Sequence, residues 1–399
     1  MTSVGLSTVG AVLKGIVTGK SVKTLERPPA AGELAILKVS AVTWGEFQPQ
    51  ESKAMPPEYD PGDCPRAMSG DILISRANTR ELVGAPVMVH GDHPQLLLSD
   101  KLLKLIPDES VVDRRYLVRA LRAPAATQHF AQCAGGTSGS MTNITQDNIR
   151  TAPIHLPALP EQRRIAAILD QADTLRAKRR EALAQLDSLM HSIFIEMFGD
   201  PIQNTMRWQV KSLESVADFF AGNSLPAGVP FEQQQGGHFL MKVSDMNLPD
   251  NEQFINRCQL WAAAGGARSA TCPTGSVVIP KRGGAISTNK KRITTRPTVL
   301  DPNLMAIAPR HSLLNLSYLY QWFMRFDLAS ISSGSSVPQL NKQDLAPLKI
   351  QVPPLALQQA FATRIQAVES LKVTHLAALA ESDALFASLQ HRAFAGQLS

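Results

Sequence analysis

Two long stretches of the chain, residues 158–200 and 354–399, have apolar residues spaced three and four positions apart. That spacing is typical of one face of an α-helix, and its persistence over five heptads predicts a coiled-coil seam rather than the face of a globular core. Pro160 and Glu161 suit a first helical turn, and Gly199 ends the first helix. The residues expected in the seam are Ile165, Ile168, Leu175, Leu186 and Leu189 in the first helix and Phe361, Val368, Leu371 and Leu385 in the second.

Each helix needs a partner, because an apolar stripe along a helix of about 38 residues, roughly 57 Å long, cannot be buried by the helix itself. The simplest partner for each helix is the other, in an antiparallel pair. Arg179 and His375 interrupt the apolar series at the same heptad position, near the midpoint of each helix. In an antiparallel pair these two residues would meet and fix the register. The alternative, in which both side chains bend outward to water, is equally compatible with the pattern.

The two helices belong to a repeat that covers nearly the whole chain. A shift of 196 residues aligns 143–199 with 339–395 without a gap, and upstream SGDILISR at 69–76 resembles TGSVVIPKR at 274–282. A repeated unit of this kind predicts a variable domain followed by a helix, used twice. The expected parts are a first variable domain at 1–157, a first long helix at 158–200, a second variable domain at 201–353 and a second long helix at 354–399.

The variable domains contain short strand signals bounded by Gly, Pro and Asn, such as GDILIS at 70–75 and NLMAIAP at 303–309. Residues 315–326 (NLSYLYQWFMRF) predict a helix among the strands. The expected fold class is therefore α+β: two globular domains separated by two long antiparallel helices, with a pseudo-two-fold internal repeat.

Composition and charge add little to this picture. The chain has 399 residues, of which 44% are apolar and 19% charged, which is typical of globular domains with ordinary cores. A net charge of +6 favours an acidic partner such as nucleic acid only weakly. The four cysteines lie far apart, which argues against a zinc site or a disulfide framework. We expect neither a signal peptide nor a membrane span, and hence a cytoplasmic protein.

The motifs of the common enzyme classes are missing from the sequence. There is no GxxxxGK[ST], no GxGxxG after a strand, no HExxH, no GxSxG, and no [DN]PP[FY] tetrad of amino-methyltransferases, since VPPL at 352–355 lacks the leading acid or amide. Carboxylates at 107–109 and 249–250 lack the partner lysine motif of a metal-dependent nuclease. We therefore expect no catalytic residue, no metal and no cofactor in this chain. A stand-alone methyltransferase is the rival enzymatic hypothesis.

A basic segment in the second variable domain is the strongest candidate for DNA binding. Residues 281–296 (KRGGAISTNKKRITTR) carry six basic residues and no acid, a composition suited to phosphate contacts and to reading base edges. The candidate residues are Lys281, Arg282, Asn289, Lys290, Lys291 and Arg292, with Arg76, Asn78 and Arg80 at the corresponding place in the first domain. An ordinary solvated strand pair would show the same composition.

The loops before the two helices are also paired: GGTSGSMTNITQDNI at 135–149 and SSGSSVPQLNKQDL at 332–345. Small residues there allow the backbone to approach phosphate closely. The candidates are Thr137, Ser138 and Ser140 in the first loop and Ser335 and Ser336 in the second. The simpler interpretation is that both loops only turn the chain onto its helix.

The segment GSSVPQLNKQDLAPLKIQVPPLALQQ at 334–359 and its counterpart LPALPEQRRIAAILDQADTLRAKRREALAQLDSLMHSIF at 156–194 resemble the specificity subunits of type I restriction–modification enzymes. The resemblance covers nearly the whole chain. The first loop is a degenerate version of the second, and Glu161-Gln162-Arg163 stands where the other copy has Leu357-Gln358-Gln359. These departures leave open whether the two helices bind partner subunits equivalently.

The resemblance implies a subunit that reads an asymmetric, bipartite double-stranded DNA target, with half-sites about one helical turn, ~10 bp, apart. It also implies two methyltransferase subunits, which would hold S-adenosylmethionine, and restriction subunits that drive translocation and cleavage. The alternative that the residues leave open is a coiled-coil protein-interaction scaffold without DNA specificity.

Overall fold

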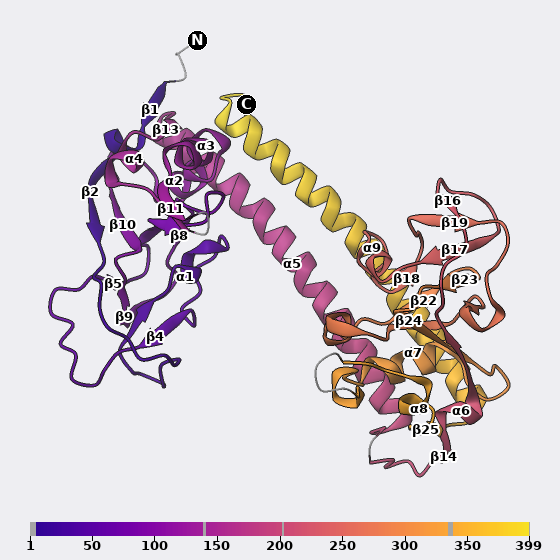
Figure 1. Ribbon diagram of the computed structural model, residues 1–399. Helices are drawn as coiled ribbons and strands as arrows, with labels where there is room; N and C mark the ends of the chain where they lie inside the picture. The colour runs from indigo at the N-terminus through magenta and orange to yellow at the C-terminus, as the bar shows by residue number, and fades with distance from the viewer. Residues whose placement is uncertain (1–4, 139–140, 202, 334–337, 399) are drawn as a thin grey trace. The chain divides into compact units, whose positions relative to one another are not determined.

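The computed structural model describes residues 5–138, 141–201, 203–333 and 338–398. Two compact units divide the chain: Met1–Arg180 with Ala378–Ser399 forms the first, and Glu181–Ala377 forms the second. The chain has two helices of 40 residues, α5 (Leu159–Phe198) and α9 (Leu355–Phe394) (Figure 1). Each of them is divided between the two units. We call the remainder of each unit its head. The division falls inside the helices rather than at their ends.

The first head contains two four-stranded sheets, a short strand pair and a three-stranded ribbon. In sheet order the strands are β2 (Leu13–Thr18), β10 (Leu102–Pro107), β6 (Ile72–Ser75) and β8 (Pro86–Met88); β4 (Ser52–Ala54), β3 (Ala35–Leu37), β9 (His93–Leu98) and β5 (Arg66–Ala67); β1 (Leu6–Thr8) and β13 (Pro153–His155); and β11 (Gly135–Ser138), β12 (Met141–Asn143) and β7 (Ala77–Asn78). Its helices are α1 (Ser40–Thr43), α2 (Arg114–Leu121), α3 (Pro124–Cys133) and α4 (Gln146–Arg150).

The second head contains two five-stranded sheets and a short strand pair. In sheet order the strands are β15 (Ala217–Ala221), β24 (Leu304–Pro309), β21 (Val277–Pro280), β22 (Arg292–Thr294) and β18 (Phe254–Ile255); β16 (Val229–Pro230), β19 (Leu260–Ala262), β17 (His238–Met241), β23 (Thr298–Leu300) and β20 (Thr271–Cys272); and β14 (Gln209–Ser212) and β25 (Lys349–Val352). Its helices are α6 (Leu213–Val216), α7 (Leu316–Met324), with Asn315 as N-cap, and α8 (Lys342–Leu345). The predicted mixture of helices and strands is confirmed, and so is the helix expected at 315–326.

The central strand of each head separates two hydrophobic cores. In β6, Ile72 and Ile74 face one core and Leu73 faces the other. In β21, Val277 and Ile279 face one core and Val278 the other. Successive side chains of a strand point to opposite faces, so a strand covered on both faces reads as a continuous apolar run. This explains why GDILIS and GSVVIP are the clearest strand signals in the sequence.

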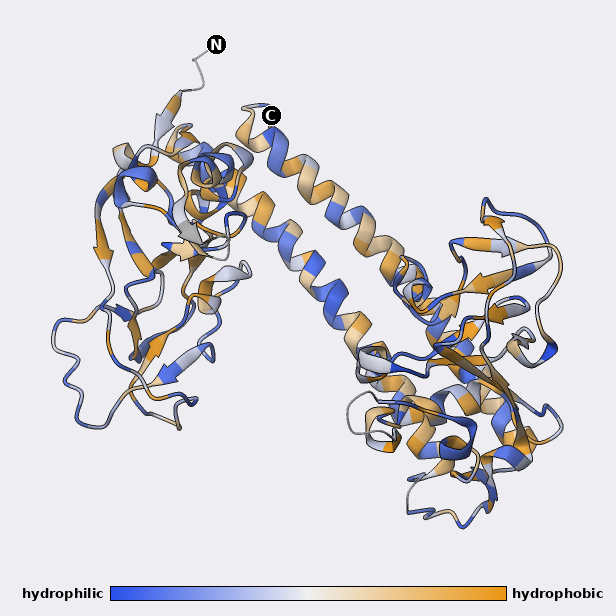
Figure 2. Cartoon of the chain, in the orientation of Figure 1, coloured by the Kyte–Doolittle hydropathy of each residue, from blue (hydrophilic) through white to orange (hydrophobic). Residues whose placement is uncertain are grey.

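Within each unit, α5 and α9 run antiparallel. In the first unit Arg176 of α5 pairs with Asp383 of α9 at 2.5 Å, and in the second unit Lys372 of α9 pairs with Asp187 of α5, also at 2.5 Å. The shift of 196 residues exchanges these two pairs, so the internal repeat extends to the contacts between the helices. In Figure 2, hydrophobic and hydrophilic bands alternate along both helices.

The buried series along the helices differs from the predicted seam. Ile165, Phe361 and Val368 are buried and Leu186 is half-buried, as expected, and Ile168 is half-buried. Four predicted seam leucines are instead exposed: Leu175 (54%), Leu189 (44%), Leu371 (52%) and Leu385 (56%). The buried or half-buried residues lie one position later, at Leu169, Arg176, Leu183 and Met190 in α5 and at Lys372, Leu379 and Phe386 in α9.

The prediction placed one of the two seam positions of each heptad correctly and the other one residue too early, because a charged residue occupies part of the true seam. Arg176 is counted as polar in a hydropathy pattern, yet its guanidinium lies over the ring of Phe386, 4.3 Å from the centroid, and pairs with Asp383. A long cationic side chain can pack its stem on apolar surface and still satisfy its charge. At the midpoints Arg179 is exposed and His375 half-buried, and their meeting stays a prediction.

Candidate nucleic-acid interface

A buried glutamine joins the first head to the helix that follows it. Gln162 of α5 is fully buried and makes three hydrogen bonds. Its side-chain oxygen accepts from the backbone N–H of Asp113 at 2.9 Å, and its amide nitrogen donates to the carbonyls of Val111 at 3.0 Å and Pro157 at 2.8 Å. Because Asp113 also caps α2, this glutamine fixes the start of α2 against the start of α5.

The second unit has the same junction. Gln358 of α9, equally buried, accepts from the N–H of Asn315 at 2.8 Å and donates to the carbonyls of Leu313 at 3.1 Å and Pro353 at 2.8 Å. Asn315 caps α7 just as Asp113 caps α2. The aligned pair of glutamines in the sequence therefore marks an equivalent structural joint in both units.

A buried tyrosine next to each joint adds a second equivalent contact. The Tyr116 hydroxyl donates to the carbonyl of His155 at 2.6 Å, and the Tyr318 hydroxyl donates to the carbonyl of Gln351 at 2.9 Å. Burial raises the pKa of both phenols. Each tyrosine thus ties its helix, α2 or α7, to the strand that precedes the long helix.

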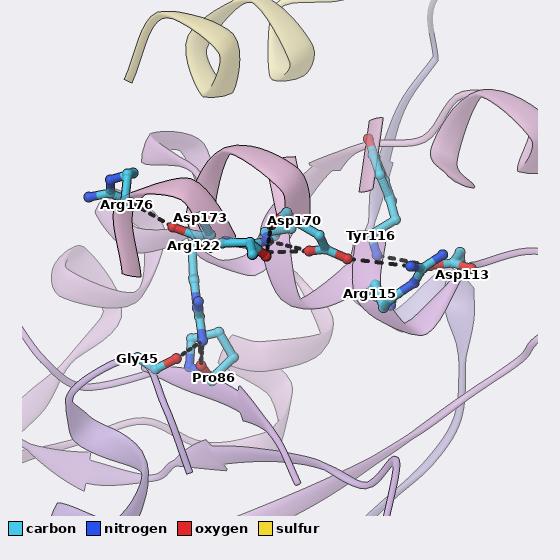
Figure 3. Close-up of polar contacts among 11 residues, drawn as sticks. Gly45, Pro86, Asp113, Arg115, Tyr116, Arg122, Asp170, Asp173 and Arg176 are labelled. Atoms are coloured by element: carbon cyan, nitrogen blue, oxygen red, sulfur yellow. Dashed lines mark hydrogen bonds and ion pairs between the residues drawn. The ribbon is translucent and has the colours of Figure 1, made fainter. Parts of the chain in front are cut away.

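The first head has in addition an ionic clamp on α5 (Figure 3). Arg119 of α2 pairs with Asp170 at 2.9 Å and also with Asp173, one turn further along α5. Arg176 pairs with the same Asp173 at 2.6 Å, and Arg115 approaches Asp170 at 3.4 Å. The charges are thus largely neutralised within the unit.

A groove of about 860 Å³ lies beside this clamp, lined by residues that include Trp44, Arg122 and Arg180. The Arg122 guanidinium donates to the carbonyls of Gly45 and of Pro86, the latter at 3.0 Å, and its burial lowers its pKa (Figure 3). The guanidinium of Arg122 is therefore committed to binding the chain's own backbone.

In the second unit the corresponding attachment is aromatic. Phe194 and Phe198 of α5 pack around Phe361 of α9, with ring centroids 5.7 and 5.1 Å away, and Tyr318 of α7 stacks on Phe194 at 5.4 Å. Offset and edge-to-face contacts between such rings are favourable. The first unit shares part of this attachment, because the rings of Tyr116 and Phe394 lie 5.7 Å apart, and the ionic clamp is added to it.

The structure brings the two kinds of predicted DNA-binding segment together in both heads. In the first head the Ile144 N–H donates to the carbonyl of Arg76 at 2.9 Å, and in the second the Leu340 N–H donates to the carbonyl of Lys281 at 2.9 Å. We call residues 76–78, 135–138 and 141–143 the first ribbon, and residues 281–283, 338–340 and Ser333 the second ribbon. In each ribbon the residues that follow the central strand, β6 or β21, pair with the residues that precede a short helix, α4 or α8.

The candidates of the first ribbon divide into exposed and internally bonded side chains. Arg76 and Arg80 are exposed. The amide nitrogen of Asn78 donates to the Thr43 hydroxyl at 3.0 Å and its oxygen accepts from the N–H of Thr79 at 2.9 Å. Asn78 therefore shapes the ribbon, while the two arginines face solvent.

The small-residue candidates are less well described. Thr137 and Ser138 form the end of β11. Ser140, Ser335 and Ser336 lie outside the described residues.

Two cationic candidates lie in the second ribbon itself. Arg282 is exposed, and Lys281 is half-buried. Burial of the Lys281 ammonium is the larger cause that lowers its pKa, and the positive charge of the neighbouring Arg282 lowers this pKa further. Arg282 is thus the cation of this segment best placed to meet a phosphate or a base.

Lys291 is a correction to the sequence analysis, because it is buried rather than exposed. Only 1% of its surface is exposed, and desolvation lowers its pKa to about 8. Its ammonium donates to the side-chain oxygen of Asn289 and to the carbonyl of Phe326, both at 2.7 Å. Asn289, in left-handed backbone with φ 54°, also accepts from the N–H of Leu328 at 3.0 Å. The two residues tie the loop after α7 to the head.

The remaining basic residues of 281–296 also bond within the head. The Lys290 ammonium donates to the side-chain oxygen of Asn247. The half-buried guanidinium of Arg292 donates to the carbonyls of Lys291 at 2.9 Å and Met246 at 3.3 Å, and its burial lowers its pKa. A charge run in sequence does not distinguish side chains that stabilise loops from those that face a partner.

The described residues contain no group of three or more His, Cys, Asp and Glu side chains that could hold a metal ion. Cys64, Cys258 and Cys272 are buried and Cys133 is partly buried, all as free thiols. Burial raises the pKa of Cys272 to about 12, which keeps this thiol protonated. In the described part of the chain no helix has the length and apolar character needed to span a membrane.

A family model of the type I restriction modification DNA specificity domain matches the chain twice, at residues 63–185 and 206–381. The chain belongs to this family. The two matches contain the two ribbons, the two glutamine joints and most of both long helices, so the repeat found in the sequence is the repeat of the family.

Curated relatives of the specificity family are distant. The EcoEI specificity subunit of Escherichia coli is 26% identical over 181 residues, which are 44% of this chain and 30% of that subunit. The chain therefore matches less than a third of that relative's length. A MjaX specificity subunit, described as putative, from Methanocaldococcus jannaschii is 24% identical over 335 residues, 77% of this chain and 73% of the relative.

Two solved structures share the fold over the full length. The type I restriction-modification S subunit from M. genitalium superposes with a TM-score of 0.61 at 12% identity, covering 99% of this chain and 97% of that one. A chain from a study of assembly and conformational transition of the type I R-M system gives 0.57 at 19% identity, covering 99% and 98%.

Sequence reasoning missed two polar residues of the ribbons in this specificity-family chain. Asn143 of the first ribbon and Gln339 of the second correspond under the 196-residue shift, and neither was singled out. The signal that could have found them is an amide kept at the same place in two otherwise unlike loops.

Proposed function

We propose that the chain is the non-catalytic DNA-recognition subunit of a type I restriction–modification complex. Each head reads one half of an asymmetric, bipartite double-stranded DNA target. The observation that carries this proposal is the equivalence of the ribbons: the same backbone hydrogen bond at 2.9 Å holds unlike side chains in the two heads. An equivalent frame with unlike side chains suits two readers of two different half-sites, because side chains that reach base edges carry sequence information.

The long helices serve in this proposal as the spacer between recognition domains at 1–157 and 201–353. Antiparallel helices turn a direct sequence repeat into an approximate two-fold arrangement, which matches two half-sites about 10 bp apart. A spacer of helix has a nearly fixed length, since each residue adds 1.5 Å. The gap between the half-sites would then be a property of the helices and not of the heads.

The partners of this subunit are two methyltransferase subunits, which hold S-adenosylmethionine, and restriction subunits with a translocase motor. The exposed leucines of the helices support the first of these. Leu175 and Leu385 in the first unit, and Leu189 and Leu371 in the second, are counterparts under the repeat and exposed over half or nearly half of their surface. Exposed apolar side chains repeated on a helix pair suit docking of partner helices. Such a complex works in the cytoplasm.

Co-expression with its genomic neighbours, followed by mapping of methylated adenines, tests this function. The expected result is one asymmetric motif of two short half-sites with a constant gap. DNA affinity of the complex should also fall linearly on a log–log plot against salt, because each neutralised phosphate releases counterions. A complex that binds DNA without salt dependence and methylates no bipartite motif would support the protein scaffold instead.

A further inference from the structure

The two ribbons have one cross-strand pair in common. One residue of this pair is similar in the two heads, and the other residue differs. In the first ribbon Asn143 of β12 is in register with Ala77 of β7. In the second ribbon Gln339 forms the equivalent antiparallel bridge with Arg282. The amide is kept, as Asn in one head and Gln in the other, while its partner changes from Ala to Arg. The backbone pairing at this position is therefore the same in both heads, while one of the two side chains changes.

The third strand of each ribbon is equivalent as well. Asn143 is also in register with Gly135, and Gln339 exchanges two backbone hydrogen bonds with Ser333, at 2.9 and 2.8 Å. The backbone of the amide residue is thus held from both sides in both heads. A strand held in this way presents its side chain in a set direction.

Three of the four side chains at this place are accessible. Asn143 and Arg282 are exposed and Gln339 is half-buried, whereas Ala77 is buried. The amide nitrogen of Gln339 donates to the side-chain oxygen of Asn341 at 3.0 Å, which orients the group without occupying its own oxygen. Directly opposed residues of an antiparallel pair project from the same face with Cβ atoms about 5 Å apart. In the second ribbon Arg282 and Gln339 can therefore contact neighbouring bases, while in the first ribbon Asn143 alone can do so.

We propose that Asn143, Gln339 and Arg282 of these cross-strand pairs are specificity-determining residues, a statement that rests on the proposed function. Asn143 and Gln339 each read an adenine, since an amide side chain matches its N6 and N7 edge. Arg282 reads a guanine beside it through O6 and N7, whereas the buried Ala77 offers no side chain to a base at the same place. The change from Ala77 to Arg282 is then one reason why the two half-sites differ.

The test uses the chain in complex with its methyltransferase subunits and maps methylated sites for four single variants. Arg282→Lys keeps the positive charge but not the bidentate geometry, so it should relax the guanine requirement by about tenfold to a hundredfold. Gln339→Ala should relax the neighbouring adenine in the same half-site, and Asn143→Ala an adenine in the other half-site. Arg282→Ala, which gives the second ribbon the residue that the first has at this place, should remove the guanine preference.

Arg257→Lys is the matched control, because Arg257 is an exposed arginine of the same head outside the ribbon. It should leave the motif unchanged. A thermal melt of each variant shows that the heads are folded, and Arg282→Lys decides the question if a harsher variant does not fold.

The possible results separate this inference from the proposed function. If the wild-type complex methylates no bipartite motif, the proposed function fails. If the wild type reads a bipartite motif and Arg282→Lys and Asn143→Ala leave it unchanged, the proposed function stands and the pairs are not readers. Relaxation of both half-sites by a single variant also overturns the inference, since each pair belongs to one head.

Discussion

The buried glutamine joints predict a large and local loss of stability when the amide is removed. Gln162→Met keeps the length and volume of the side chain but removes all three of its hydrogen bonds. The N–H of Asp113 and the carbonyls of Val111 and Pro157 would remain without these partners in a site that is closed to solvent. Gln358→Met does the same to the second unit.

The expected cost follows from the number of bonds. Each intramolecular hydrogen bond contributes about 1 kcal/mol net, and a buried group left unsatisfied costs about 1–3 kcal/mol. Three such groups, offset by the easier burial of an apolar side chain, give a loss of about 3–5 kcal/mol. For a unit of this size each kcal/mol lowers the melting temperature by about 2–4 °C, so the expected fall is roughly 10 °C.

Hydrogen exchange provides a local assay because two of the donors are single backbone amides. Gln162→Met should accelerate exchange at Asp113 and leave Asn315 unchanged, and Gln358→Met should show the reverse. Gln171→Met, at an exposed position of α5, is the control and should change neither. A loss in either joint variant no larger than that of the control, or equal acceleration at both amides, would refute the account of the joint.

Three further predictions concern the second head, the helix surface and the spacer. Burial lowers the folded-state pKa of Lys291 to about 8, below its ordinary value, so its contribution to stability should rise between about pH 8 and 10.5, by about 2–3 kcal/mol, and urea unfolding of Lys291→Met should lack this rise. Leu175→Ser with Leu385→Ser should leave the melting temperature unchanged but weaken co-purification with the methyltransferase subunit at least tenfold, since both leucines are already exposed in the free chain; unchanged association would remove this surface from the docking site. Deleting 177–183 together with 373–379 keeps the Arg176–Asp383 and Lys372–Asp187 ion pairs and removes about 10 Å of helix, so the mapped gap should shorten by about three base pairs; a constant gap would rule out the spacer.

The sequence was sufficient to predict the repeat, the two long helices and the mixed heads, because these depend on periodicity. A period of three and four residues over five heptads identifies a helix whatever its partner is. That pattern could not tell which of two adjacent heptad positions is buried in the seam, since both positions contain leucines. The decision depends on Arg176 and Lys372, whose stems are half-buried and whose charges are paired across the helices, and hydropathy counts both residues as polar.

The candidate DNA-binding residues show a second limit. The structure brings the predicted segments together, in that the basic segment and the small-residue loop form one ribbon in each head. The sequence did not tell which side chains face solvent, because charge density does not reveal direction. Lys291, the most buried cation of its segment, ties a loop in place, whereas Arg282, nine residues earlier, is exposed. Only the structure distinguishes an internal ammonium from an external guanidinium.

Some contacts are the same in the two units and others differ, and this comparison indicates how such a protein can change its target. The glutamine and tyrosine contacts at the joints are alike in both units, and so are the backbone bonds of the ribbons. Both units also have a tyrosine–phenylalanine ring contact, to which the first adds an ionic clamp and the second further aromatic rings, so the joint tolerates different neighbours. A substitution of the exposed Arg282 side chain touches none of these contacts. Such a substitution would therefore alter what one head reads while leaving its hold on the helices, and the other half-site, as they were.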